Sequence, residues 1–394
     1  MSKGFRIGRI FGINIRVDWS WLLIFALTTW NLATAFSGFH SEWGLALTWG
    51  TAAVAAVLFF ASVLMHELAH SLIAKGQGIP VRSITLHLFG GVSNIQREPE
   101  SPSDEFLMAI VGPITSLVIG GALAWIVLAS AGLSGALTDP ARALGQLGPL
   151  FTLLLWLGSV NVMVGLFNLI PGFPLDGGRV LRSIMWVLTD NLRRATRWAS
   201  WVGQAIAWLM ILAGIAMTFG MRIPILGTGL GNGLWLAFIG WFLNSASVKS
   251  YQKLVIQDIL EGVPVERMMR ADPPTCSADC SVSRLVHDHI MQTDEQSFPI
   301  LKNGTRQLTG LVTLEDVRGV SRDAWDTTKV ADIMMPLDKL VLVSPEDDAA
   351  DALGKLTGRD VRQLPVVREG ELVGMLRRRD IIRWLQLQSE LNIG

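Results

Sequence analysis

His66, Glu67 and His70 form the pattern His-Glu-x-x-His within an apolar stretch at residues 47–73. On a helix, positions four apart lie on one face, so the two imidazoles can reach the same metal ion. Glu67 would then lie beside that ion, where a carboxylate can accept a proton from water. Ionisable side chains are costly in an apolar helix, so these three together indicate a metal site instead of two structural histidines.

A tetrahedral zinc site with an open position needs a third protein ligand, and Asp176 is the candidate. It follows Pro171 and Pro174 in a stretch where prolines and glycines interrupt the helical pattern. Interrupted helix within a membrane is tolerated only where it lines a cavity or is buried in protein. The alternative is that Asp176 only caps a helix that begins at Gly177.

The sequence resembles the site-2 protease family of intramembrane zinc metalloproteases in two motifs, His66-Glu67-x-x-His70 and Asn168-x-x-Pro171-x-x-x-Leu175-Asp176-Gly177. The resemblance implies one Zn²⁺ per chain, bound by His66, His70 and Asp176, with Glu67 as catalytic base. It also implies that Asn168 helps to position the substrate or to stabilise an oxyanion. One departure is Ser116, which stands where many members carry Asn in a Gly-Pro-x-x-Asn pattern.

The family's activity is the hydrolysis of peptide bonds within or next to transmembrane segments of membrane proteins, in regulated intramembrane proteolysis. Residues 81–95 alternate in polarity around a Gly-Gly turn, which predicts a β-hairpin. A helical substrate must unwind to expose its scissile bond, and an extended segment is satisfied by strand addition. By resemblance, the strand that pairs with substrate includes Gly90, Gly91 and Val92. We interpret His87 as a half-buried strand residue and not as a metal ligand.

Composition divides the chain into two parts. About one residue in ten is charged before residue 249, against nearly one in three after it. The first part contains six apolar runs of spanning length, which predicts a multi-pass α-helical membrane domain over 1–248 with about six transmembrane helices. The six runs are 19–37, 47–73, 106–132, 148–171, 198–219 and 228–246.

The short segments between these runs predict the orientation. With the N-terminus inside, the inner segments collect 12 Lys and Arg residues and the outer segments two, so both termini are expected in the cytoplasm at the inner membrane. The chain carries 33 Lys+Arg and 33 Asp+Glu, and this balance argues against nucleic acid as a partner. The expected partners are the lipid bilayer and a transmembrane protein substrate.

The charged part, after a linker at 249–261, contains two similar segments at 262–322 and 328–388. They resemble a tandem of CBS domains, a cytoplasmic α/β Bateman module. The resemblance implies binding of ATP or another adenine nucleotide and association into homodimers. The positions that match the nucleotide-binding motif are Thr313 and Asp316 in the first copy and Arg377 and Asp380 in the second. Arg377–Arg379 could equally be the solvated start of a helix.

Two further points concern the whole chain. Cys276 and Cys280 are the only cysteines, and we expect two ordinary thiols in a reducing compartment. A membrane transporter or channel regulated by CBS domains is the main alternative function, with the intramembrane His, Glu and Asp side chains as an ion path. No inverted repeat supports it. A catalytically dead scaffold is a weaker alternative, because Glu67 is intact.

Overall fold

The structure is a computed structural model of the chain, and it describes residues 4–88, 90–95, 97–130, 147–223, 228–358 and 361–391. It divides into two compact units, Met1–Gln252 and Lys253–Gly394, which are described separately below.

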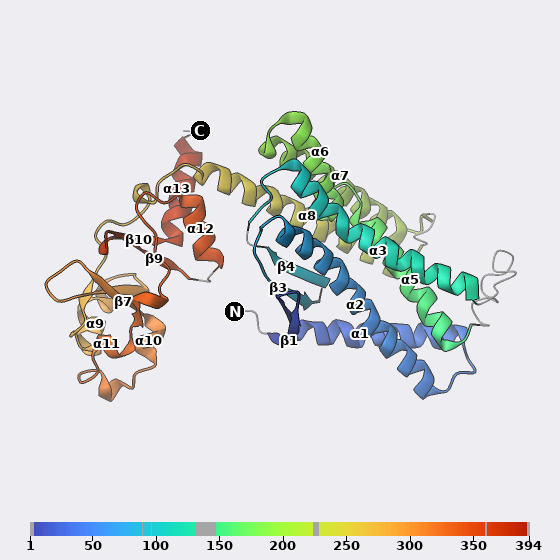
Figure 1. The fold of residues 1–394 in the computed structure, drawn as a ribbon, viewed down its shortest axis with the longest axis horizontal. Coiled ribbons are helices and arrows are strands. Elements are labelled where there is room, and N and C mark those ends of the chain that lie inside the picture. The colour runs from blue at the N-terminus through green and yellow to red at the C-terminus, as the bar shows by residue number, and fades with distance from the viewer. Residues whose placement is uncertain are drawn as a thin grey trace. The chain divides into compact units, whose positions relative to one another are not determined.

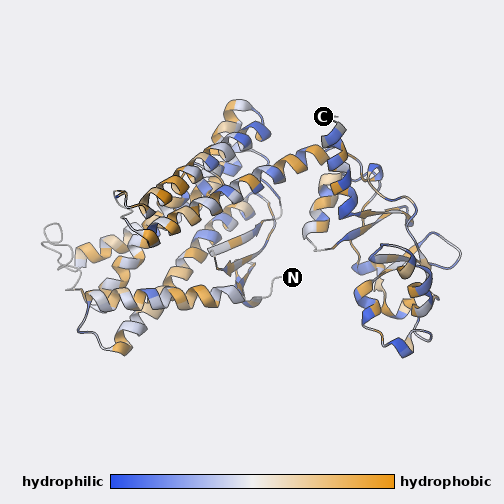
Figure 2. Ribbon diagram, turned by 180° about the vertical axis from the view of Figure 1, so that it is seen from behind, coloured by the Kyte–Doolittle hydropathy of each residue, from blue (hydrophilic) through white to orange (hydrophobic). Residues whose placement is uncertain are grey.

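Long helices make up most of the first unit (Figure 1). Five of them are long and apolar enough to cross a membrane. The five are α1 (Trp19–Phe39), α2 (Leu45–Gly76), α3 (Pro102–Ser130), α5 (Pro149–Asn168) and α7 (Leu192–Thr218). Figure 2 shows hydrophobic residues predominating along these helices, which confirms a multi-pass α-helical domain.

Two other helices complete this unit, α6 (Asp176–Thr189) and α8 (Leu230–Leu260). The predicted sixth run, 228–246, lies largely within α8, which is not among the five apolar helices of the described residues. The count of six spans therefore remains a prediction. Residues 249–261, predicted as a linker, are the last turns of α8 and the turn that follows.

Small residues allow the central helices to approach closely. A Cβ atom on Gly120 of α3 would lie 2.7 Å from the carbonyl oxygen of Gly158 in α5. A Cβ atom on Gly165 would lie 3.1 Å from the carbonyl oxygen of Pro113. Such packing suits helices in lipid, where association depends on close backbone contact more than on hydrophobic burial. As a result α3 lies against α2, α5 and α6.

A four-stranded sheet accompanies the helices. Its strands are β1 (Gly4–Ile10), β2 (Ile13–Asp18), β3 (Val81–His87) and β4 (Gly90–Ile95), in the order β1-β2-β3-β4. β2 and β3 are parallel, whereas β3 and β4 form an antiparallel hairpin, as predicted for residues 81–95. β4 is an edge strand and packs on α2.

The second unit contains two copies of a small α/β arrangement. In the first copy, β6 and β7 form a hairpin that leads into α10; in the second, β9 and β10 form a hairpin that leads into α13. The strands are β5 (Cys276–Ser277), β6 (Ser297–Leu301), β7 (Leu308–Thr313), β8 (Met335–Pro336), β9 (Gln363–Arg368) and β10 (Glu371–Arg377). The helices are α9 (Val282–Asp288), α10 (Leu314–Arg318), α11 (Val330–Ile333), α12 (Ala349–Gly358) and α13 (Arg378–Leu391), with single 3₁₀ turns at Val265–Arg267, Ile290–Gln292, Arg322–Ala324 and Leu337–Lys339.

The two copies exchange their leading segments. Arg270, at the start of the first copy, pairs through its backbone with Met375 in β10 of the second. Conversely, β8 of the second copy pairs with β7 of the first. Glycines make room for this exchange, because a Cβ atom on Gly310 would lie 2.6 Å from the sulfur of Met334.

One expectation for this unit is wrong. The structure joins Cys276 and Cys280 in a disulfide, with their Cα atoms 6.5 Å apart, where the sequence predicted two free thiols. The physical reason is local geometry: the first lies in β5 and the second precedes α9, so a turn between them brings the sulfur atoms together.

Candidate metal centre and nucleotide-binding residues

The predicted ligands from α2 and α6 converge on one point. His66 and His70 are buried on one face of α2, and their Nε2 atoms are 3.1 Å apart. Asp176 is the first residue of α6, and its Oδ2 atom lies 3.1 Å from Nε2 of His66 and 3.2 Å from Nε2 of His70. Two imidazoles and one carboxylate thus form a nearly equilateral triangle.

The hydrogen bonds at Nδ1 of each histidine determine which kind of ligand the three Nε2 and Oδ2 atoms can bind. Nδ1 of His70 lies 2.6 Å from the carbonyl oxygen of Met108, which can only accept, so Nδ1 must carry the proton. Nε2 of the neutral ring is then an acceptor that faces two other acceptors. Nδ1 of His66 lies 2.9 Å from Oγ of Ser116, a hydroxyl that can accept from this nitrogen and thereby hold the ring in the same tautomer. A cluster of this kind is suited to hold a cation between its members.

The dimensions of the cluster fit zinc. Zinc–ligand distances of about 2.0–2.1 Å in a tetrahedron place neighbouring ligand atoms about 3.3 Å apart. The backbone leaves room on the same side, because a Cβ atom on Gly112 of α3 would lie 2.1 Å from Nε2 of His70. Nitrogen and carboxylate ligands at these separations suit Zn²⁺, and three protein ligands leave a fourth position for a reactant.

Glu67 occupies the place expected for a base. It is half-buried next to His66 on α2, and its Oε2 accepts a hydrogen bond of 2.8 Å from Oγ of Ser93 in β4. Gly91 lies directly over this carboxylate, since a Cβ atom there would be 2.5 Å from Cγ of Glu67. The edge strand therefore touches the candidate base.

The alternative of a capping role for Asp176 does not match the structure. α6 begins at Asp176 itself, and Leu175 is in the N-cap position. The following glycine is required for the chain to turn here, because a Cβ atom on Gly177 would lie 2.4 Å from the carbonyl group of Leu169. The carboxylate is thereby directed to the two histidines.

Asn168 lies at the end of α5, where its Nδ2 donates to the carbonyl oxygen of Val164 at 3.0 Å. Within the described residues it makes no hydrogen bond to the three metal-ligating side chains. His87, half-buried in β3, is outside the candidate metal-binding cluster of the described residues.

The groups that hold the candidate ligands in place, the Met108 carbonyl and the Ser116 hydroxyl, were not predicted from the sequence. The Met108 carbonyl has no sequence signal, because every residue has one. Ser116 could have been found, since it occupies the position where the family often has Asn and lies four residues after Gly112 on the same helix face.

The predicted nucleotide residues adopt two different arrangements. In the first copy, Oδ2 of Asp316 accepts from the backbone N–H of Thr313 at 2.8 Å and from its hydroxyl at 2.7 Å. In the second copy, Arg377 binds both carboxylate oxygens of Asp380, with Nε 2.6 Å from Oδ2 and Nη2 2.5 Å from Oδ1. The hydrogen bonds to Asp380 raise the pKa of Arg377 above its ordinary value; burial acts in the opposite direction, and the charges of Asp380 and then Glu295 raise it further.

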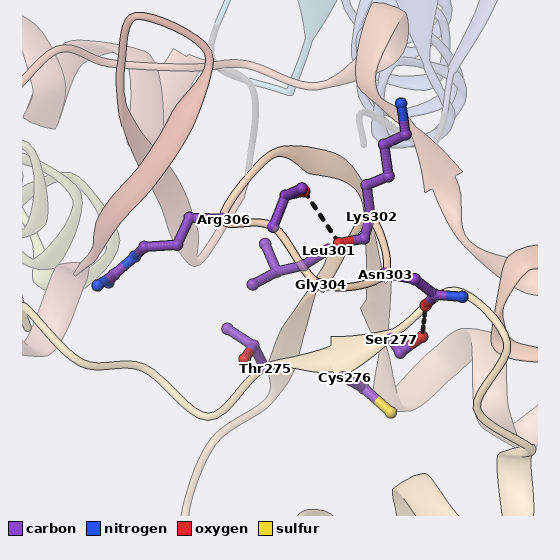
Figure 3. A pocket seen from close by; sticks show the side chains of 9 residues that line it. Thr275, Cys276, Ser277, Leu301, Lys302, Asn303, Gly304 and Arg306 are labelled. Atoms are coloured by element: carbon purple, nitrogen blue, oxygen red, sulfur yellow. Dashed lines mark hydrogen bonds between the residues drawn. The ribbon is translucent and has the colours of Figure 1, made fainter.

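A separate hollow of about 620 Å³ lies at β5 and at the turn between β6 and β7 (Figure 3). Its wall includes Ser277 and Asn303, joined by a hydrogen bond, and the cations Lys302 and Arg306. The residues described as lining it include neither Asp316 nor its counterpart in the second copy. It is therefore not the predicted nucleotide site.

Comparisons with known proteins give matches for both parts of the chain. Residues 54–212 match peptidase family M50, and residues 265–323 and 330–387 each match the CBS domain. The chain is 33% identical to "Putative zinc metalloprotease Rip3" of Mycobacterium tuberculosis, over 98% of this chain and 94% of that protein. It is 34% identical to "Putative zinc metalloprotease sll0528" of Synechocystis, over 99% and 97%. The solved site-2 protease of Methanocaldococcus jannaschii is 26% identical and covers 63% of this chain and 95% of its own, with a TM-score of 0.39.

Helices apolar enough to span a membrane, a cluster of two histidines and an aspartate that could hold a metal ion, and paired CBS domains are together typical of a membrane-embedded metalloprotease. The chain belongs to peptidase family M50, the site-2 protease family. The interpretation of the protein as a metalloprotease is therefore preferred to the alternative of a transporter or channel.

Proposed function

We propose that the protein cleaves peptide bonds within or next to transmembrane segments of membrane-protein substrates. The observation that carries this proposal is the convergence of His66, His70 and Asp176 beside Glu67, on a helix apolar enough to span a membrane. The metalloprotease activity follows from the family. The proposal that the cut lies within or next to the membrane follows from the position of His66, Glu67 and His70 on α2, a helix apolar enough to span a membrane.

The chemistry divides between the metal and the chain. His66, His70 and Asp176 would hold the zinc ion, which would supply a Lewis acid for the scissile carbonyl and lower the pKa of water toward about 7. Glu67 accepts the proton of the attacking water and passes it to the leaving amine. Ser93 orients the Glu67 carboxylate through its hydroxyl hydrogen bond. Asn168 helps to hold the substrate backbone near the reacting carbonyl.

Strand addition at β4 would present the scissile bond. Gly90, Gly91 and Val92 form the beginning of an edge strand, and the Val92 side chain is 51% exposed. A substrate segment that has lost its helical hydrogen bonds would regain them along this edge. Gly91 would bring that segment close to Glu67, because no side chain separates the strand from the carboxylate.

The CBS pair would bind an adenine nucleotide such as ATP and thereby modulate cleavage. We assign the principal site to the first copy. Oδ1 of Asp316 accepts no hydrogen bond from the described residues, so it is available to ribose hydroxyl groups. In the second copy both carboxylate oxygens of Asp380 are occupied by Arg377. A nucleotide there would have to break a bidentate ion pair first.

The remaining assignments concern the setting of the enzyme. We place both termini on the cytoplasmic side of the inner membrane, with about six spans and domains at 1–248, 262–322 and 328–388. This orientation rests on the charge asymmetry of the short loops. Homodimers would form through the CBS pair.

The decisive test compares wild type with Glu67→Gln as purified proteins. Both should contain zinc, and cleavage of a membrane-tethered substrate should fall about 10²- to 10⁴-fold in the variant. Glu100→Gln, which alters an exposed carboxylate, is the control and should cleave normally. Equal cleavage by Glu67→Gln would remove Glu67 as the base. Repeating the assay with and without ATP tests modulation by the tail.

A further inference from the structure

One face of α3 supports the metal centre along its length. Glu105, Met108, Gly112 and Ser116 are spaced by three, four and four residues, which places them on a single helix face. Three of these positions reach the histidines directly, through the Met108 carbonyl, the space left by Gly112 and the Ser116 hydroxyl. Glu105 is the fourth and contacts neither histidine.

Glu105 instead binds α6, the helix that begins with Asp176. Its side chain is fully buried, and its Oε1 accepts hydrogen bonds from Nε of Arg182 at 2.6 Å and from Nη2 of the same residue. Arg182 is only 7% exposed. Its guanidinium also lies 5.4 Å from the ring centre of Phe173, in the segment that leads into Asp176.

A buried ion pair of this kind contributes little to stability compared with apolar side chains of the same volume, because both charges lose their hydration. Its contacts do restrict position, because two N–H groups of Arg182 converge on the single oxygen Oε1, and Nε of Arg179, also on α6, lies 3.6 Å from the same atom. Arg182 follows Asp176 by six residues, which is about 9 Å along a helix. A helix is stiff over that length, so a displacement at Arg182 would move the Asp176 carboxylate.

We propose that Glu105 and Arg182 are positioning residues that lock α6 to α3 and so place Asp176 at metal-binding distance from the histidines. α3 then sets all three ligands, two by direct hydrogen bonds and the third through this ion pair. The inference rests on the proposed assignment of Asp176 as the third ligand.

The test measures zinc affinity of the purified full-length protein by competition with a chelator. Arg182→Lys keeps the charge but offers one nitrogen in place of the two that reach Oε1, and Glu105→Gln keeps the shape but loses the charge. Each should weaken zinc binding about 10- to 100-fold, as expected for residues that orient a metal ligand. Glu98→Gln is the matched control, because Glu98 contacts Arg182 from a partly exposed position at 3.4 Å and should leave the affinity near wild type.

A second arm separates positioning from general destabilisation. In an Asp176→Ala background, Arg182→Lys should cause no further loss of zinc affinity, because its effect passes through Asp176. Additive losses, or unchanged affinity in both single variants, would overturn the proposal. If Glu105→Gln does not fold, Arg182→Lys and its combination with Asp176→Ala decide the matter.

These variants distinguish the assignment of Asp176 as a ligand from the positioning role of Glu105 and Arg182. Unchanged zinc affinity in Asp176→Ala alone would refute the ligand assignment itself. Weakened binding in Asp176→Ala with normal binding in Arg182→Lys would refute only the positioning role. As an additional readout, the visible spectrum of the Co²⁺-substituted protein should change in Arg182→Lys if the carboxylate is displaced, and should stay unchanged in Glu98→Gln.

Discussion

Each imidazole of the metal centre is held at its Nδ1 atom by α3. The Met108 carbonyl orients His70, and the Ser116 hydroxyl orients His66. The carbonyl fixes Nε2 of His70 as an acceptor, and the hydroxyl can do the same for His66 by accepting from its Nδ1; partners of this kind usually raise metal affinity. Gly112 belongs to the same set, because only its lack of a side chain lets α3 approach the rings.

Gly112→Ala should abolish zinc binding and cleavage. Its new Cβ atom would lie 2.1 Å from Nε2 of His70 and 2.7 Å from Nε2 of His66, so the ring atoms that bind zinc would be pushed apart. Zinc content of the purified protein checks this. Gly121→Ala, on the same helix with open space around it, should retain zinc. Normal zinc content in Gly112→Ala would mean that the rings do not bind metal where the structure places them.

The convergence of the three candidate ligands could be predicted from the sequence, because His66 and His70 are one helical turn apart and Asp176 is a rare acid at a similar depth. Their supporting groups could not. α3 is apolar on every side, so its composition does not reveal which face meets α2 or α6. The Cys276–Cys280 bond was missed because its formation depends on a turn between β5 and α9.

At the scale of elements, β4 connects the substrate edge with the catalytic base. Ser93 donates to the Glu67 carboxylate, while Gly91 lies directly over the same side chain. The hairpin was predictable from alternating polarity, but its contact with α2 was not, because local pattern does not define which helix a sheet edge meets.

Gly91→Ala should lower kcat and leave zinc content unchanged. The added methyl group would lie 2.5 Å from Cγ of Glu67 and would displace the carboxylate or the strand. Metal analysis and cleavage kinetics together test this. Gly76→Ala, at the end of α2 with nothing nearby, should behave as wild type. Full activity in Gly91→Ala would argue against close contact between β4 and the base.

The two CBS copies differ in the availability of one carboxylate, so we expect one nucleotide per chain. Titration calorimetry with ATP should give a stoichiometry near one, which Asp316→Asn should abolish and Asp380→Asn should leave nearly unchanged. The reason is that Arg377 already occupies Asp380. Loss of binding in Asp380→Asn alone would reverse the assignment of the site.

The whole chain joins an apolar helical unit to a charged α/β unit, and this division was visible in the distribution of charge. The membrane helices and the repeated tail were predicted for the same reason, since each solvent demands its own composition. The sixth run remains a prediction, because α8 combines apolar and polar turns.

The proposed orientation has a direct test. Trypsin should remove the tail, residues 253–394, from inverted membrane vesicles and should spare it in right-side-out vesicles. The physical reason is the excess of Lys and Arg in the predicted inner segments. Detergent-solubilised protein, in which both sides are accessible, is the control. Digestion only in right-side-out vesicles would place the tail outside.

The exchanged leading segments make each CBS copy incomplete without the other. Met334 packs over Gly310 and Met269 over Gly374, so each copy supplies a piece of its neighbour's surface. A deletion of either copy would expose the surface on the remaining copy that the other copy's methionine covers. It would also leave the remaining copy's own leading segment, with Met269 or Met334, without its partner. We therefore expect the two copies to fold as one unit, so that neither copy alone would form a stable domain.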